Sequence, residues 1–396
     1  MKFTDLGLDP RILEGIDAMG YENATPVQQQ VMVPILEGKD IIAAAQTGTG
    51  KTAAFLLPLL HRLLTSPHHA GDINAMIIVP TRELAIQIAE SIEGLSYFTD
   101  VSSIAVYGGG DGNSFVTEKK ALTSGVDIVV CTPGRMIAHL NMGYVKLKGL
   151  KYLVLDEADR MLDMGFSDDL SKIFTFLPAV RQNLLFSATM PAKMRVLAKK
   201  LLNNPIEINI AISKPPEQIV QKAFILYEAQ KVPIIIDMLS SKKFSKVIVF
   251  CSKKLNVKQL TVKLKSAKLA VAEIHSDLDQ KSREQYLQDF RNQKINILVA
   301  TDVLSRGIDI DDIDLVINYD VPNDGEDYIH RIGRTARAAT SGTAFTLVSE
   351  NEQGKCAIIE QLLGEPIFKG TVPAEFGPTP AYNPKAVVKK GFNRRR

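Results

Sequence analysis

Short runs of apolar residues alternate along this chain with longer stretches that have helical periodicity. In the first half, four runs have the length and composition of buried strands: Ile41–Ala44, Met76–Val79, Ile128–Val130 and Tyr152–Leu155. Continuously apolar runs of this kind are typical of a parallel sheet that is covered on both faces. Because a helix-like stretch separates one run from the next, the pattern predicts an α/β domain.

A second series of strand-like runs follows in the other half, at Val247–Phe250, Ile297–Ala300 and Leu315–Ile317. Between the two series, polar residues and prolines interrupt the pattern, which indicates a linker. After about residue 370 the chain is rich in Pro, Gly, Asn and Lys, which favours a flexible tail. We therefore predict two tandem α/β parallel-sheet domains, a short linker and a disordered basic tail, with these boundaries: 1–208, 209–219 (linker), 220–369 and 370–396 (tail).

Composition narrows the class of protein. The chain has 396 residues, of which 45% are hydrophobic and 23% are charged, as is usual for soluble globular proteins. No apolar run approaches the roughly 18 residues of a membrane span, and the N-terminus lacks the pattern of a signal peptide, so we expect a cytoplasmic protein. Cys131, Cys251 and Cys356 lie too far apart to predict a disulfide framework or a metal site, and we expect small buried hydrophobes.

The net charge of +3 is unevenly distributed. Residues 384–396 contain six basic residues and no acidic one, which leaves 41 basic and 44 acidic residues in the rest of the chain. The tail is thus a basic segment attached to a nearly neutral body. It could bind a polyanion, or it could serve only as a solubilising segment.

A glycine-rich segment follows the first strand-like run and precedes a helix. It consists of Ala45, Gln46, Thr47, Gly48, Thr49, Gly50, Lys51 and Thr52. In a phosphate-binding loop, backbone amides at a helix N-terminus turn toward phosphate oxygens. Lys51 would reach the β and γ phosphates of a nucleotide and Thr52 would hold Mg²⁺, although Ala45 stands where the strict pattern has Gly.

The run Tyr152–Leu155 ends in the acidic sequence Asp156-Glu157-Ala158-Asp159. Ligands of parallel α/β sheets bind at the carboxyl ends of the strands. Asp156 would hold Mg²⁺ there, and Glu157 would orient and deprotonate the attacking water. An acidic turn by itself is more often a helix cap, but the preceding phosphate loop favours the catalytic interpretation.

Near the end of the second half, Arg334 and Arg337 are three residues apart and so share one face if the segment is helical. Guanidinium groups that reach a nucleotide stabilise charge on the transferring phosphoryl group. The alternative is a solvated basic face.

Taken together, these motifs resemble the DEAD-box RNA helicases, from Phe3 to about Ser349. The letters at 156–159 match the name of that family, and the other motifs follow in the order of the family. The resemblance implies two RecA-like domains. Gly20-Tyr21 and Thr25-Pro26-Val27-Gln28 resemble the Q motif, which implies that Tyr21 stacks on adenine and that Gln28 bonds to its edge. Without the resemblance, Tyr21 would be an ordinary aromatic residue.

The resemblance also implies an RNA-binding surface that contacts sugars and phosphates rather than bases. The residues expected at the RNA are Thr81, Arg82, Gly108, Gly109, Thr132, Arg135 and Thr301. Each of the first-domain segments taken alone could be a structural turn. The residues expected to couple hydrolysis to RNA release or to serve the domain interface are Ser187, Thr189, Arg306 and His330. Asp309 is expected near the ribose, and Ala336 departs from the Gly that is common before the last arginine.

The function expected from the resemblance is RNA-stimulated ATP hydrolysis that separates short RNA duplexes, with ATP and Mg²⁺ as cofactors. Two other functions stay open: a DNA-dependent ATPase of related architecture, and an RNA-clamping scaffold or chaperone. The basic tail after a bare core is similar to that of bacterial RhlE-type helicases. We expect a monomer that binds RNA without sequence preference and no membrane, with ribosome-assembly or RNA-decay proteins as candidate partners.

Overall fold

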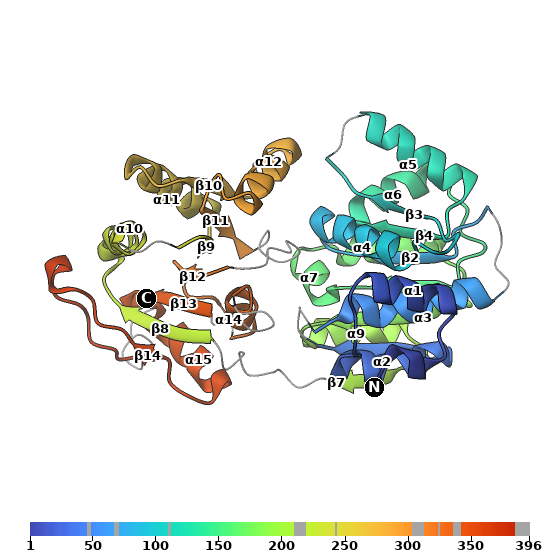
Figure 1. Cartoon of the computed structure of the whole chain (residues 1–396), viewed down its shortest axis with the longest axis horizontal. Coiled ribbons are helices and arrows are strands. Elements are labelled where there is room, and N and C mark those ends of the chain that lie inside the picture. The colour runs from blue at the N-terminus through green and yellow to red at the C-terminus, as the bar shows by residue number, and fades with distance from the viewer. Residues whose placement is uncertain are drawn as a thin grey trace, which may run out of the picture. The chain divides into compact units, whose positions relative to one another are not determined.

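The computed structural model describes residues 1–45, 49–66, 71–109, 112–209, 219–241, 244–302, 313–323, 325–335 and 342–384. The chain divides into two compact units, Met1–Ile212 and Ser213–Arg396. Within the described residues, each unit contains one seven-stranded sheet in which all strands run parallel (Figure 1). The predicted fold class, α/β with two tandem parallel-sheet domains, is therefore confirmed. Most of the predicted linker lies outside the described residues.

The sheet of the first unit has the strand order β3-β4-β2-β5-β6-β1-β7. Its strands are β1 (Ile41–Ala44), β2 (Ala75–Ile78), β3 (Ser103–Val106), β4 (Ile128–Cys131), β5 (Tyr152–Leu155), β6 (Gln182–Ser187) and β7 (Ile206–Asn209). All four strand-like runs predicted for this half are strands. Because the central strands are buried on both faces, their apolar residues are continuous rather than alternating.

Two hydrophobic clusters lie on the two faces of this sheet, and successive residues of a strand belong to different clusters, as Ile77 and Ile78 do. The helices of the first face are α1 (Pro10–Ala18), α2 (Pro26–Leu36), α3 (Lys51–Thr65) and α4 (Arg82–Leu95). Those of the second face are α5 (Gly112–Ser124), α6 (Pro133–Asn141), α7 (Ala158–Asp163), α8 (Ser167–Phe176) and α9 (Ala192–Leu201). The unit is thus a three-layer sandwich.

Strand β6 was not predicted, because it begins with two polar residues, Gln182 and Asn183. Both side chains are buried and bonded to the chain. The Gln182 amide donates to the carbonyls of Ile35 and Lys39, and Asn183 donates to the carboxylate of Asp40 from its backbone amide (2.8 Å) and its side chain (3.1 Å). Their hydrogen bonds offset the cost of burial, which no local pattern reveals.

The second unit has the strand order β10-β11-β9-β12-β13-β8-β14. Its strands are β8 (Ile219–Ile225), β9 (Val247–Cys251), β10 (Val271–Ile274), β11 (Ile297–Thr301), β12 (Leu315–Asn318), β13 (Gly342–Val348) and β14 (Phe368–Lys369). Helices α10 (Lys231–Ser241) and α11 (Lys254–Ser266) cover one face. The other face is covered by α12 (Gln280–Arg291), α14 (Gly325–Ile332) and α15 (Gln353–Leu363).

Residues 370–384 differ from the expected flexible tail, because they pack against the second unit. Phe376 contacts the hydrophobic cluster beside α10, and its carbonyl accepts a hydrogen bond of 2.7 Å from Gln230. The hydroxyl of Tyr382 donates to Glu360 on α15 at 2.6 Å. Aromatic side chains anchor a segment that composition alone assigns to the tail. The strongly basic residues 385–396 lie outside the described part of the chain.

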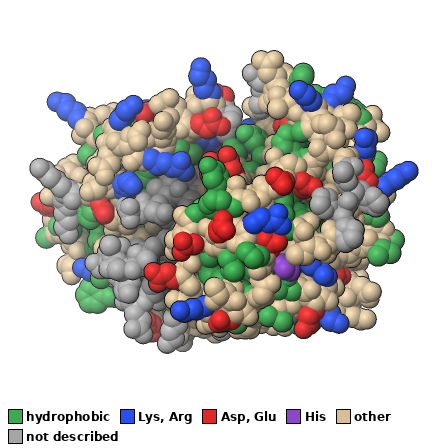
Figure 2. Space-filling model, turned by 45° about the vertical axis from the view of Figure 1, so that its right-hand side comes forward, with side chains coloured by type: hydrophobic (Ala, Val, Ile, Leu, Met, Phe, Trp, Pro, Cys, Tyr) green, Lys and Arg blue, Asp and Glu red, His purple; other side chains and the backbone are tan. Residues whose placement is uncertain are grey.

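The distribution of surface charge and the burial of the cysteines agree with what the composition predicts. Acidic and basic side chains are interspersed on the face seen in Figure 2, as expected for a nearly neutral body. Cys131, Cys251 and Cys356 are buried and free, and burial raises the pKa of each thiol. Within the described residues, every helix is too short or too polar to cross a bilayer.

Candidate functional site

Six of the predicted motif segments follow strands of the first sheet, and all lie at its carboxyl edge. The phosphate loop follows β1, the acidic tetrad follows β5, and Ser187 ends β6. The three predicted RNA segments follow the other strands: residues 81–82 follow β2, residues 132–135 follow β4 and residues 108–109 follow β3. Given the strand order, one half of the edge (β5, β6, β1) holds the predicted nucleotide motifs and the other half (β3, β4, β2) holds the predicted RNA motifs. The two halves meet between β2 and β5.

The phosphate loop joins β1 to α3, as expected. Gly50 has a φ of 88°, in the left-handed region that favours glycine, and α3 begins at the next residue. The buried Lys51 ammonium donates to the carbonyl of Ala45 at 2.7 Å, which closes the loop on itself. Thr52 lies in the first turn of α3 and Thr49 precedes Gly50. Three predicted residues of the loop lie outside the described part: Gln46, Thr47 and Gly48.

Gln28 is tied to the phosphate loop. Its side-chain amide donates to the carbonyl of Gly50 at 3.1 Å, and its side-chain oxygen accepts from the backbone amide of Thr25 at 2.8 Å. A Cβ at Gly50 would lie 2.6 Å from the Gln28 nitrogen, so a larger residue there would displace the Gln28 side chain. Gln28 retains one N–H and one lone pair for a ligand. Tyr21 lies three residues past the end of α1 and is 39% exposed.

The acidic tetrad turns sharply at Glu157, whose φ of 49° is unusual for a residue other than glycine. The backbone amide of Glu157 donates to the carboxylate of Asp156 at 2.9 Å, and its own carboxylate lies 3.2 Å from the Arg160 guanidinium. Burial raises the pKa of Asp156 to about 6, and the positive charge of Lys51 opposes this shift. The turn thus places two buried carboxylates side by side near the phosphate loop.

Asp159, the last residue of the tetrad, connects the turn to the end of β6. Its carboxylate accepts hydrogen bonds of 2.9 Å from both the backbone amide and the hydroxyl of Thr189. The hydroxyl of Ser187 in turn donates to the carbonyl of Thr189 at 2.6 Å. Neither residue is the N-cap of the helix that follows, because Pro191 occupies that position of α9. A displacement of the tetrad would be transmitted directly to this segment.

On the other half of the edge, Thr81 is the N-cap of α4 and accepts a hydrogen bond of 3.3 Å from Leu84. The guanidinium of Arg82 lies against Gly109, where a Cβ would come within 1.9 Å of it. Gly109 also has a φ of 88°, so only glycine fits. Gly108 lies beside it. The structure thus brings two of the three predicted RNA segments into contact.

Thr132 precedes α6, and Arg135 lies in the first turn of this helix. The Arg135 side chain is only 16% exposed, because it lies 2.7 Å from the buried carboxylate of Glu118 and stacks over the ring of Phe115. The same carboxylate is 2.8 Å from Nε2 of the fully buried His139. Arg135 thus holds α5 against α6 through its Nε, while its Nη2 is buried without a hydrogen-bond partner among the described residues.

In the second unit, Thr301 ends β11 and the next residue, Asp302, pairs with Arg331 of α14 at 2.5 Å. Arg331 also donates to Asn318 at 3.1 Å and to the carbonyl of Asp320 at 2.8 Å. It therefore joins the ends of β11 and β12 to the helix that carries His330.

Arg334 lies two residues past the end of α14. Three predicted residues of this unit lie outside the described part of the chain: Arg306, Asp309 and Arg337.

Sequence reasoning missed Glu118, His139 and Asp302. Glu118 is 17 residues from Arg135, and in the sequence it is one more charged residue of a polar helix. Only the packing of α5 on α6 makes it a buried carboxylate. Asp302 adjoins a recognised motif, and the only available signal was a carboxylate directly after a buried strand.

We predict that Arg135→Ala loosens α5 and α6 by about 2 kcal/mol, because it removes the charged partner of a buried carboxylate. Hydrogen exchange of the α5 and α6 amides should then be about thirtyfold faster, while exchange in α10 and α11 stays unchanged. Adding Glu118→Gln to Arg135→Ala should restore part of the protection. Equal exchange in Arg135→Ala and wild type would contradict this structural role.

Comparison with known proteins agrees with this geometry. Residues 25–197 match the DEAD/DEAH box helicase family, and residues 230–339 match the helicase conserved C-terminal domain. The ATP-dependent RNA helicase CshA of Listeria monocytogenes is 42% identical over 361 residues, which are 91% of this chain and 68% of the relative. The ATP-dependent RNA helicase eIF4A of Scheffersomyces stipitis is 38% identical over 378 residues, 95% of this chain and 93% of the relative.

Solved structures are similar as well. Dbp5 of S. cerevisiae, bound to RNA and ADP BeF3, has a TM-score of 0.83 at 32% identity, covering 94% of this chain and 96% of that one. Mss116p, bound to ssRNA and AMP-PNP, has a TM-score of 0.83 at 30% identity, covering 94% of this chain and 80% of that one. With the motifs at one sheet edge and relatives of this identity and coverage, the chain belongs to the DEAD-box family of ATP-dependent RNA helicases.

Proposed function

We propose that this protein uses RNA-stimulated ATP hydrolysis to separate short RNA duplexes and to remodel ribonucleoproteins. The observation that carries the proposal is the division of one sheet edge into a nucleotide half and an RNA half that adjoin between β2 and β5. Relatives named as ATP-dependent RNA helicases and similar structures bound to RNA support it. Neither a DNA-dependent ATPase nor a scaffold without hydrolysis is favoured by these relatives.

In the proposed nucleotide site, the phosphate loop and Lys51 hold the phosphates, and Tyr21 and Gln28 recognise adenine. Glu157 orients the attacking water and accepts its proton. The second unit supplies Arg334 and Arg337, whose guanidinium groups stabilise charge on the transferring phosphoryl group, while Asp309 contacts the ribose. The burial of Glu157 and its ion pair of 3.2 Å with Arg160 support this role, because they hold the carboxylate in one position.

The donors near the phosphate loop fit Mg²⁺. Asp156 presents a buried carboxylate, and Thr52 offers a hydroxyl in the first turn of α3. Magnesium sites of phosphate-transfer enzymes use one or two carboxylates and complete their coordination with phosphates and water. When bound, the ion would neutralise charge on the phosphates. Asp156 and Thr52 would hold it, and Asp156 also accepts the Glu157 amide, which sets the position of the base.

We propose that Ser187, Thr189, Arg306 and His330 couple hydrolysis to release of the RNA. The hydrogen bonds from Thr189 to Asp159 support this role for the first two, because they connect the tetrad to the segment after β6. RNA would contact the edge segments at Thr81, Arg82, Gly108, Gly109 and Thr132, and Thr301 from the second unit. Arg135 would contact RNA from the same edge, and its ion pair with Glu118 would hold α6 in place.

Several finer assignments stay predictions. These are added RNA affinity from the basic residues 385–396, a monomeric state, a cytoplasmic location and partners among ribosome-assembly or RNA-decay proteins. The RhlE-type subfamily also stays a prediction, since the relatives compared above are named CshA and eIF4A.

We predict that ATP turnover is slow for the protein alone and rises strongly with single-stranded RNA, because the proposed arginines and the phosphate loop belong to different units. Steady-state phosphate release with RNA, with DNA of the same sequence and without nucleic acid tests this. Equal stimulation by single-stranded DNA would favour a DNA-dependent ATPase instead.

The Glu157→Gln variant should still bind ATP and RNA, while its rate of ATP turnover falls at least about 100-fold. The change removes the base and leaves the phosphate contacts in place. Lys51→Ala should instead weaken ATP binding itself. Fluorescent-nucleotide titration and single-turnover hydrolysis separate the two effects. Normal hydrolysis by Glu157→Gln would show that another group activates the water.

Gln28→Ala should raise the KM for ATP and reduce the preference for ATP over GTP. Gln28 is proposed to contact adenine, and its side chain also bonds to the phosphate loop at Gly50. Tyr21→Ala should affect base preference without touching the loop. The ratio of kcat/KM for ATP and GTP in each variant provides the measurement. An unchanged ratio in both would rule out the adenine assignment.

A further inference from the structure

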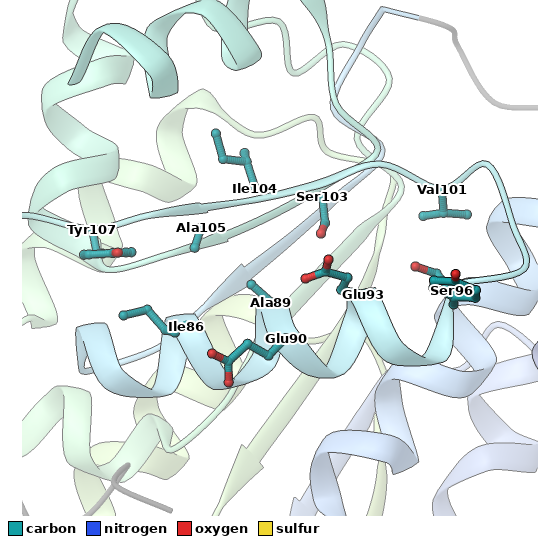
Figure 3. A pocket seen from close by; sticks show the side chains of 11 residues that line it. Ile86, Ala89, Glu90, Glu93, Ser96, Val101, Ser103, Ile104, Ala105 and Tyr107 are labelled. Carbon is teal, nitrogen blue, oxygen red and sulfur yellow. The ribbon is translucent and has the colours of Figure 1, made fainter. Parts of the chain in front are cut away.

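A groove runs along the first unit between α4 and the edge strand β3, outside the nucleotide and RNA motifs. It has a volume of about 640 Å³. In Figure 3, Ile86 and Tyr107 lie at one end, Ala89 and Ala105 in the middle, and Ser96 and Val101 at the other end. The groove follows the strand along its length, and this shape suits an extended chain better than a compact ligand.

The strand beside the groove has an open edge. β3 is the last strand of the sheet on this side. The carbonyls of Ser102 and Val106 accept hydrogen bonds of 3.0 Å from β4 and from the residue after it. Because backbone groups alternate with a period of two, those of Ser103 and Ala105 point to the open edge. Open edges pair readily with a further strand.

The opposite edge of the same sheet is protected, whereas β3 is not. Natural edge strands avoid unwanted pairing through proline and charged residues. β7 is preceded by Pro205 and carries the exposed Glu207. β3 has the sequence Ser-Ile-Ala-Val, with neither a proline nor a charge. The absence of such protection is expected where pairing serves a purpose.

The charge of the groove is negative. Glu90 and Glu93 of α4 line it and are exposed, and in Figure 3 Glu93 points toward Ser103 on β3 whereas the Glu90 carboxylate lies on the side of α4 away from β3. No Lys or Arg is among the lining residues. Within the part of the chain that the structure describes, neither carboxylate forms a salt bridge. RNA would be repelled by these carboxylates, while Lys or Arg side chains would pair with them.

Aromatic and small apolar side chains complete the surface. Tyr97 lines the groove at the end of α4 and is 76% exposed, with its ring 5.2 Å from that of Phe98. An exposed aromatic ring at the rim suits an apolar or guanidinium side chain. The small side chains of Ala89 and Ala105 leave the middle of the groove open, so that the backbone of another chain can approach the strand.

We propose that this groove docks an extended, basic segment of a partner protein, which adds to β3 as a further strand. Backbone hydrogen bonds to the open edge would supply much of the affinity, and Lys or Arg side chains at Glu90 and Glu93 would select the segment. The site is new with respect to the helicase chemistry, and its occupation requires neither ATP nor RNA.

The groove shares its walls with the RNA edge. α4 begins at Arg82, and β3 leads directly into Gly108 and Gly109. A segment bound between α4 and β3 therefore contacts both elements that carry the Arg82–Gly109 contact. Binding of the segment and of RNA would be thermodynamically linked.

The full-length protein can be tested with a fluorescein-labelled peptide of about eight residues that alternates Lys and Val. Anisotropy titration should show binding to wild type and a loss of about tenfold or more in the Glu90→Lys, Glu93→Lys variant, in which attraction becomes repulsion. The matched control is Glu37→Lys, Glu207→Lys, which has the same change of charge at exposed residues near the opposite edge. It should bind the peptide as wild type does.

Two N-methylated isomers of the peptide test strand addition itself. A strand uses every second amide for pairing, so methylation of one alternate set should abolish binding while methylation of the other set leaves it intact. The proposal is overturned if wild type does not bind the peptide, if the groove and control variants bind it equally, or if both isomers behave alike. It is also overturned if the groove variant loses single-stranded RNA while peptide binding is unchanged, since the groove would then be an RNA surface.

Discussion

Every strand of the first sheet runs in the same direction, and this constraint organises the site. Since parallel strands end at one edge, loops that are far apart in the sequence are brought together there. The order β3-β4-β2-β5-β6-β1 then decides which loops become neighbours. The parallel direction is itself maintained by helices on both faces, because the continuously apolar strands must be buried on each side.

Buried polar contacts connect these strand-end loops more specifically than the sheet does. Asp159 holds Thr189, Gln28 holds Gly50, and in the second unit Arg331 holds Asp302. Each contact joins two motifs that are 22 to 30 residues apart in the sequence. A buried polar group left without its partner is costly, so each pair moves together or breaks at a measurable cost. Such connections are suited to transmit a change at the phosphates to other loops.

The half of the edge that is predicted to bind RNA has a structural support of its own. Arg135 belongs to a predicted RNA segment, yet its side chain is occupied by Glu118 and Phe115. The contact of Arg82 with Gly109 similarly joins two segments before any RNA is bound. Along the same two elements, α4 and β3, lies the acidic groove. The groove prefers basic protein segments, and the adjoining edge is predicted to bind negatively charged RNA. These opposite charge preferences would keep protein docking separate from RNA binding.

The sequence by itself determined the fold class, seven of the strands and the places of the nucleotide motifs, because continuous apolar runs and glycine-rich or acidic turns are local signals. It predicted no role for Glu118 or Asp302, since their importance depends on packing between helices and strands distant in sequence. It also missed β6, whose polar start is buried by hydrogen bonds to α2 and Asp40, and the anchoring of residues 370–384 through Phe376 and Tyr382. Only the tertiary structure decides such contacts, because the desolvation and pairing that make them matter arise from neighbours that no local pattern identifies.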